Sequence, residues 1–131
     1  MRKLLVALAL VSAAASSALA GARWTEPVYI YVSPDGSGYV DGTLSDSRAT
    51  SDGVTLLGCE VWASTVGAPG GHCFARDNAG HNVSCTLTSP DLIRTVGMIN
   101  SGSRIHFNWD STKVCNYVLV VNASYVAPLA P

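Results

Sequence analysis

Three histidines and a set of scattered aspartates are the side chains of this chain that could perform acid–base or metal chemistry. His72, His81 and His106 could each transfer a proton near neutral pH or bind a metal. If the turn between the first two is symmetric about its centre, His81 faces the same side as Asp77 and His72 faces the opposite side. A bulge in that turn would reverse this arrangement. Because neither metal-ligand spacing nor a nucleophile signature is visible, we expect no catalytic residue, no metal site and no cofactor.

Four aspartates in the first half of the chain could supply oxygen ligands for Ca²⁺. They are Asp35, Asp41, Asp46 and Asp52, on or beside glycine-rich stretches. Their spacing does not match an EF-hand, and aspartate is common in turns because its carboxylate binds nearby backbone N–H groups. We therefore interpret these aspartates as turn residues.

Aromatic side chains near a carboxylate are the best candidates for a binding surface. Strand alternation places Trp62 on the same face as Glu60, and places Tyr29 and Tyr31 on the less buried face of their own strand. Rings beside carboxylates on a sheet are a common way of holding sugars. The same rings could equally be cross-strand pairs that cover a second sheet or lie under a helix, so both interpretations stay open. The partner would be a glycan or another surface protein.

Four cysteines, Cys59, Cys73, Cys85 and Cys115, indicate two disulfides in an oxidising compartment. A glycine-rich loop lies between the first two, and its flanking strands should meet as a hairpin. This favours Cys59 with Cys73, which leaves Cys85 with Cys115. The closest alternative joins Cys73 to Cys85 across the following turn. The spacing lacks the close Cys-x-x-Cys pair that a zinc site would require.

The elements that position these residues are short apolar runs separated by turn signals, a pattern typical of an antiparallel β protein. We predict strands over residues 27–32, 38–44, 54–63, 71–76, 81–87, 103–109 and 114–122. Seven strands fit a mainly β fold, an antiparallel β-sandwich or flattened barrel. The unbroken apolar run at residues 118–121 is expected to be the most buried segment.

One short helix is predicted over residues 90–99. Ser89 offers an N-cap side chain, and Pro90 suits the first helical position. Apolar residues then recur at helical spacing until the Asn100-Ser101-Gly102 run ends the pattern.

Residues 1–20 have the features of a signal peptide. Arg2 and Lys3 precede an apolar stretch, and Ala18-Leu19-Ala20 is a small-residue cleavage site. Cleavage would leave residues 21–131 as one disulfide-stabilised β domain, secreted or periplasmic, without a membrane span. It would also leave six basic against nine acidic residues, a net charge of about −3, which argues against nucleic acid as a partner.

The order of several short motifs resembles a group of small, secreted, uncharacterised bacterial proteins with a four-cysteine β domain. The motifs that carry the resemblance include Gly42-Thr43-Leu44, Gly58-Cys59, Cys73-Phe74-Ala75-Arg76, Ser84-Cys85, Phe107-Asn108-Trp109-Asp110 and Asn122-Ala123-Ser124-Tyr125. The resemblance spans residues 42–125, and it implies export, disulfides and a compact β domain without transferring a catalytic residue.

These observations predict an exported structural or binding module without catalytic activity. The first alternative is a carbohydrate-binding module that uses exposed aromatic residues. The second is a small secreted hydrolase or a protease inhibitor, whose exposed loop would be residues 66–71.

Overall fold

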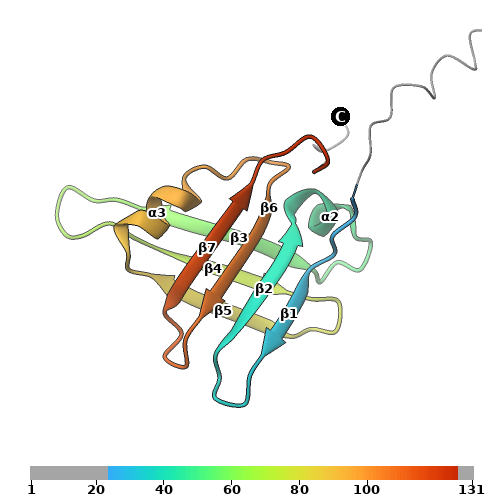
Figure 1. The fold of residues 1–131 in the computed structure, drawn as a ribbon, viewed down its shortest axis with the longest axis horizontal. Helices are drawn as coiled ribbons and strands as arrows, with labels where there is room; N and C mark the ends of the chain where they lie inside the picture. Colours follow the sequence, from blue (N-terminus) through green and yellow to red (C-terminus); the bar gives the residue numbers. More distant parts are fainter. Residues whose placement is uncertain (1–23, 127–131) are drawn as a thin grey trace, which may run out of the picture.

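The structure, a computed structural model, describes residues 24–126 as seven strands and two helices (Figure 1). The four-stranded sheet has the order β1 (Tyr29–Val32), β2 (Gly38–Thr43), β6 (Arg104–Trp109) and β7 (Cys115–Val121). The three-stranded sheet has the order β3 (Leu56–Trp62), β4 (Gly70–Arg76) and β5 (Asn82–Leu87). The helices are α2 (Leu44–Ala49) and α3 (Pro90–Val96). The predicted signal peptide, residues 1–20, lies outside the described residues.

The two sheets pack face to face, and their strands cross steeply in Figure 1. All paired strands within each sheet are antiparallel. Alternate residues point inward and form one core, with Val40, Ile105, Phe107 and Trp109 from one sheet and Cys73, Ala75, Cys85 and Leu87 from the other. The prediction of a mainly β, two-layered antiparallel fold is therefore confirmed.

The described residues contain a second helix, α2, that the sequence analysis did not predict. It begins directly after β2, where the Thr43 side chain caps the helix by accepting a hydrogen bond from the N–H of Asp46. Leu44, only 6% exposed, joins the core. The prediction of a single helix is incomplete because a six-residue helix carries too little periodicity to be recognised.

Helix α3 confirms the other prediction, although it ends at Val96 rather than at residue 99. The Ser89 side chain makes no capping hydrogen bond, so the predicted N-cap is wrong in that detail. The carbonyl of Ser89 instead accepts the N–H of Ile93. The helix packs against β7, β3 and β4 and buries Val96.

Strand β7 corrects the prediction that residues 118–121 are the most buried segment. It is an edge strand, in which Val118 faces the core and Leu119 is 38% exposed. Leu119 lies opposite His106 on the outer face of the four-stranded sheet, which no described strand or helix covers in Figure 1. An unbroken apolar run therefore does not require burial on both sides.

Two disulfides, Cys59–Cys73 and Cys85–Cys115, confirm the preferred pairing. The first joins directly opposite residues of β3 and β4. The second joins β5 to the first residue of β7 and therefore ties the two sheets together. Cys73 and Cys85 are also opposite each other in the sheet. The spacing alone therefore fits the alternative pair, Cys73 with Cys85, as well.

Candidate functional site

The outer face of the four-stranded sheet carries a band of aromatic rings that crosses all four strands. We call this the aromatic band, and it comprises Tyr29 and Tyr31 on β1, Tyr39 on β2, His106 on β6 and Tyr117 on β7. The band exists because alternation sends Val40 and Phe107 into the core and their strand neighbours outward. The register then places these outward residues next to one another.

Ring contacts connect the members of the aromatic band. The Tyr39 ring lies 5.9 Å from Tyr29, 5.4 Å from Tyr31 and 5.5 Å from His106, measured between ring centroids. His106 in turn lies 5.8 Å from Tyr117. Tyr29, Tyr31 and Tyr117 are nevertheless 54%, 44% and 47% exposed. The rings thus support one another and still present a large apolar area to solvent.

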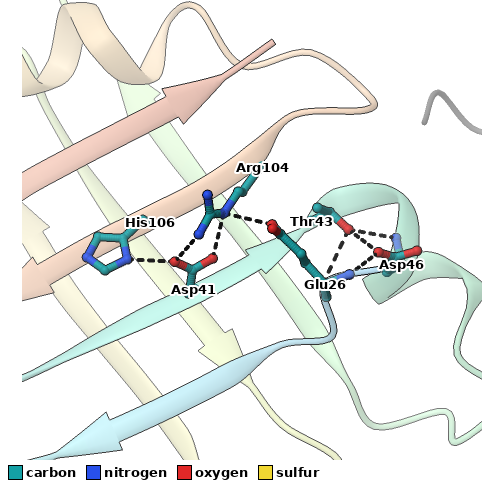
Figure 2. Close-up of polar contacts among 6 residues, drawn as sticks. All are labelled: Glu26, Asp41, Thr43, Asp46, Arg104 and His106. Atoms are coloured by element: carbon teal, nitrogen blue, oxygen red, sulfur yellow. Dashed lines mark hydrogen bonds and ion pairs between the residues drawn. The ribbon is translucent and has the colours of Figure 1, made fainter. Parts of the chain in front are cut away.

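A cluster of ionisable side chains adjoins the aromatic band at His106, and Figure 2 shows its members. We call it the ion-pair cluster, and it comprises Glu26, Asp41, Arg104 and His106. The Arg104 guanidinium binds both carboxylate oxygens of Asp41, each at 2.9 Å. Its Nε also lies 2.7 Å from Oε2 of Glu26, and Nδ1 of His106 lies 2.9 Å from Oδ2 of Asp41. The cluster therefore fixes the orientation of the His106 ring within the aromatic band.

Asp41 and Arg104 form an ion pair at neutral pH. Burial alone would raise the pKa of the Asp41 carboxyl, but hydrogen bonds from Arg104 and His106 outweigh it and hold that pKa below its ordinary value. The hydrogen bond to Asp41 also raises the pKa of Arg104. Asp41 is therefore an ionised carboxylate held by a permanently charged guanidinium.

A second set of hydrogen bonds connects the ion-pair cluster to helix α2 (Figure 2). The backbone N–H of Glu26 donates to Oδ2 of Asp46 at 2.7 Å. The Thr43 hydroxyl donates to the same oxygen at 2.6 Å. Asp46 therefore ties the start of the helix to the segment before β1.

The three histidines lie apart, and His81 pairs with Asp77 as predicted for a symmetric turn. His106 lies in the four-stranded sheet, His72 in β4, and His81 in the turn after β4, where its Nδ1 is 2.7 Å from Oδ2 of Asp77. That turn is symmetric, with Arg76 opposite Asn82. Within residues 24–126 each of the three imidazoles has a carboxylate partner, and no hydroxyl or thiol hydrogen-bonds to any of them.

The four predicted ligand-binding residues do not form one surface. Tyr29 and Tyr31 belong to the aromatic band, whereas Trp62 and Glu60 lie on β3 in the other sheet. The inner faces of the two sheets pack together, so their outer faces point in opposite directions. Trp62 lies against Gly70 and 5.9 Å from His72, forming a smaller aromatic group.

Sequence reasoning missed the residues that complete the site: Tyr39, Asp41, Arg104 and Tyr117. The alternation of Arg104 and His106 with core residues does identify the solvent-exposed face of that strand. The order of strands in the sheet places β2 between β1 and β6. No short-range sequence pattern indicates that order.

The predicted turn roles of the aspartates are confirmed for two positions and wrong for two. Asp35 accepts hydrogen bonds from Ser37, and Asp52 accepts the N–H groups of Val54 and Thr55. Asp41 instead lies within β2 and Asp46 within α2. In the described part of the chain, no three His, Cys, Asp or Glu side chains are grouped as a metal site would require.

The loop considered for a protease inhibitor, predicted over residues 66–71, lies three residues earlier at its start and two residues earlier at its end. Gly70 and Gly71 belong to β4, so the loop between β3 and β4 is residues 63–69. Val66 is 82% exposed, and its N–H donates to Oγ of Ser64 at 3.2 Å. This loop is accessible, but it lacks the network of contacts that braces the aromatic band.

Fold and site together define a disulfide-linked, two-sheet β-sandwich with an exposed aromatic face on its four-stranded sheet. Comparison of the chain with protein families, with curated proteins and with solved structures finds no match. Neither helix of residues 24–126 has the length and hydrophobicity needed to cross a bilayer.

Proposed function

We propose that the chain is an exported binding module without catalytic activity, and that the outer face of the four-stranded sheet is its binding surface. The observation that carries this proposal is the aromatic band, which is exposed although its rings are held by mutual contacts and by the ion-pair cluster. Exposed aromatic side chains that are already ordered lose little conformational freedom on binding. Such residues often contribute most of the affinity of an interface.

Three observations support export to the periplasm or the outside of the cell. Both disulfides lie in the folded domain, and disulfides persist mainly in oxidising compartments. The signal-like residues 1–20 and the resemblance to small secreted bacterial proteins agree with this assignment. The partner is then a glycan or a protein at the surface or in the envelope of the producing cell.

The absence of catalysis is supported by the surroundings of the histidines. His106 is oriented by Asp41, as a general base would be. Its ring, however, lies between Tyr39 and Tyr117 on a sheet face, and no Ser, Thr or Cys side chain of the described residues hydrogen-bonds to it. This arrangement serves to hold a ring in position rather than to activate a group.

A retention assay on the producing cells and their isolated envelopes tests the proposal. Fluorescently labelled mature protein is added at increasing concentration, and the bound fraction is measured for the wild type, for Tyr29→Ala/Tyr117→Ala and for Trp62→Ala. The expected result is saturable retention that weakens about tenfold or more in the double variant, because two anchor rings are lost. Trp62→Ala, on the opposite face, should bind within about twofold of the wild type. Absence of saturable retention, or equal retention by the double variant, would contradict the proposal.

A further inference from the structure

A hollow of about 400 Å³ opens at one end of the aromatic band, between the β1–β2 turn and the β6–β7 turn. Its walls include two rings, two amides and two carboxylates, from Tyr31, Tyr39, Asn108, Asn116, Asp35 and Asp110. The volume lies within the range of about 300–1,000 Å³ that is usual for small-molecule sites. The hollow therefore combines ring faces with hydrogen-bonding groups beside the proposed binding surface.

Several polar atoms of this hollow have no partner among residues 24–126. Oδ1 of Asn108 is buried and accepts no hydrogen bond. Asp35 uses Oδ1 to accept from Ser37, and Asp110 uses Oδ1 to accept from Thr112 and Val114, so each Oδ2 remains available. The two free carboxylate oxygens can accept hydrogen bonds from ligand hydroxyls, whereas Oδ1 of Asn108 is shielded from solvent.

The base of the hollow is held in place before any ligand arrives. The carbonyl of Gly36, in the β1–β2 turn, accepts hydrogen bonds from Nε1 of Trp109 at 2.9 Å and from Nζ of Lys113 at 2.8 Å. Trp109 is only 1% exposed and contacts Gly38, where a Cβ would come within 2.6 Å of the indole ring. Both turns are thus tied to a core residue, which lowers the ordering cost of binding.

The charges around the hollow disfavour an anionic ligand. No Lys, Arg or His side chain lines it, and the Lys113 ammonium is engaged with Gly36. Hydrogen bonds from Ser37 and Thr112 hold the pKa values of Asp35 and Asp110 below the ordinary range, so both are carboxylates at neutral pH. An anionic ligand would be repelled, whereas a neutral polyol can donate hydroxyls to carboxylate and amide oxygens.

We infer that this hollow binds one neutral pyranose ring of a glycan, with the C–H face of the sugar against Tyr31 and its hydroxyls on Asn108, Asn116 and the two aspartates. The inference rests on the proposed function, since it makes the aromatic band the surface along which the rest of the glycan lies. A sugar fits better than a flat aromatic ligand because carboxylate acceptors and amide and serine hydroxyl groups surround the rings, and sugar hydroxyls can both donate to and accept from such groups.

An NMR titration of the ¹⁵N-labelled mature protein tests the inference. The probes are methyl glycosides of glucose, galactose, mannose, xylose and N-acetylglucosamine, with methyl glucuronide and methyl galacturonide as anionic counterparts. We expect at least one neutral glycoside to cause saturable shifts of amides in residues 33–39 and 108–116, with millimolar affinity. The matching uronide should bind about tenfold more weakly or not at all, because of the two carboxylates.

Point variants test whether the residues of the hollow bind the ligand or only support the fold. Tyr31→Ala and Asn108→Ala should each weaken the titration about tenfold, whereas Tyr31→Phe, which keeps the ring, should stay within about twofold. Trp62→Ala serves as the control on the opposite face, and the dispersion of each spectrum verifies folding. The inference is wrong if no neutral glycoside saturates, if the uronides bind equally well, or if the shifts map elsewhere.

N-acetyl-lysine amide is a further probe, and stronger binding of it at these amides would assign the hollow to a basic peptide and overturn the inference.

The two proposals can fail separately. If Tyr29→Ala/Tyr117→Ala loses cell retention while no glycoside binds, the inference about the hollow falls and the binding surface stands. If glycosides bind in the hollow but the double variant is retained normally on cells, the proposed binding surface falls instead.

Discussion

Arg104 shows how burial decides what a charged residue contributes. Its side chain is 30% exposed and binds Asp41 and Glu26, which are 24% and 21% exposed. Arg94 makes a geometrically similar contact with Asp91 at 2.9 Å, but those side chains are 76% and 84% exposed. Water screens the second pair far more than the first. The two arginines therefore form a natural comparison within one molecule.

Replacing Arg104 by alanine should lower the free energy of unfolding by about 1–3 kcal/mol, because two partly buried carboxylates lose their counter-charge. Arg94→Ala should change it by no more than about 0.5 kcal/mol. Urea denaturation followed by tryptophan fluorescence measures both values. Equal effects of the two substitutions would show that the ion-pair cluster does not stabilise the face.

The acid sensitivity of the protein is predicted from individual carboxylates. Hydrogen bonds from the side chain and backbone of Thr55, and from the backbone of Val54, lower the pKa of Asp52 from 3.8 to about 2. Since the folded pKa is depressed, the stability contributed by Asp52 is present above about pH 4 and is lost as the pH falls towards 2. The lowered pKa values of Asp35, Asp41, Asp77 and Asp110 act in the same direction.

Asp52→Asn should therefore make the unfolding free energy less dependent on pH between about 4 and 2. Thr55→Val, which removes one of the donors, should give a smaller change in the same direction. Denaturation midpoints collected across this pH range provide the measurement. A variant as acid-sensitive as the wild type would contradict the assigned cause.

At the scale of elements, the starts of the two helices differ in the hydrogen bonds that their N-cap side chains make. The Thr43 hydroxyl both accepts from the Asp46 N–H and donates to the Asp46 carboxylate. Ser89 occupies the same position before α3 but makes no side-chain capping bond. Comparing substitutions at the two N-caps therefore measures how much the side-chain hydrogen bonds of Thr43 contribute to stability.

Thr43→Val keeps the shape of the side chain and should cost about 1–2 kcal/mol of stability through the lost cap. Ser89→Ala should cost only a few tenths of a kcal/mol because no side-chain capping bond is lost. Thermal unfolding of both variants provides the comparison. If the two substitutions destabilise equally, the cap at Thr43 has no special contribution.

Local patterns predicted most strands and the direction of their side chains. The alternation around His106 and around Cys85 correctly separates core from outer residues, since the pleat imposes that rule on any strand. The same patterns do not reveal which strands are neighbours. Tyr39 and Tyr117 are far apart in sequence and meet across His106 only because β6 lies between β2 and β7. For this reason the two rings of β1 were predicted, but the band they belong to was not.

For the molecule as a whole, the two disulfides have different roles. Cys59–Cys73 closes a span of 14 residues within one sheet, whereas Cys85–Cys115 closes 30 residues and joins both sheets. The chain-entropy model gives the longer link about 0.7 kcal/mol more stabilisation. The longer link also holds the end of β7, one strand of the proposed binding surface, against β5.

Cys85→Ala/Cys115→Ala should therefore destabilise the protein more than Cys59→Ala/Cys73→Ala, by about 3–4 against about 2–3 kcal/mol. Urea denaturation of the two variants under oxidising conditions tests the order. The reverse order would show that the link between the sheets is not the more important constraint.

The central claim is that the protein binds through the aromatic band. Oxidative footprinting with mass spectrometry tests it directly, by comparing side-chain modification in free protein and in protein bound to envelopes of the producing cell. The account predicts that Tyr31 and Tyr117 become protected on binding, while Trp62 and Met98, which are 51% and 58% exposed elsewhere on the molecule, react as before. Protection of Trp62 with unchanged reactivity of the two tyrosines would contradict it.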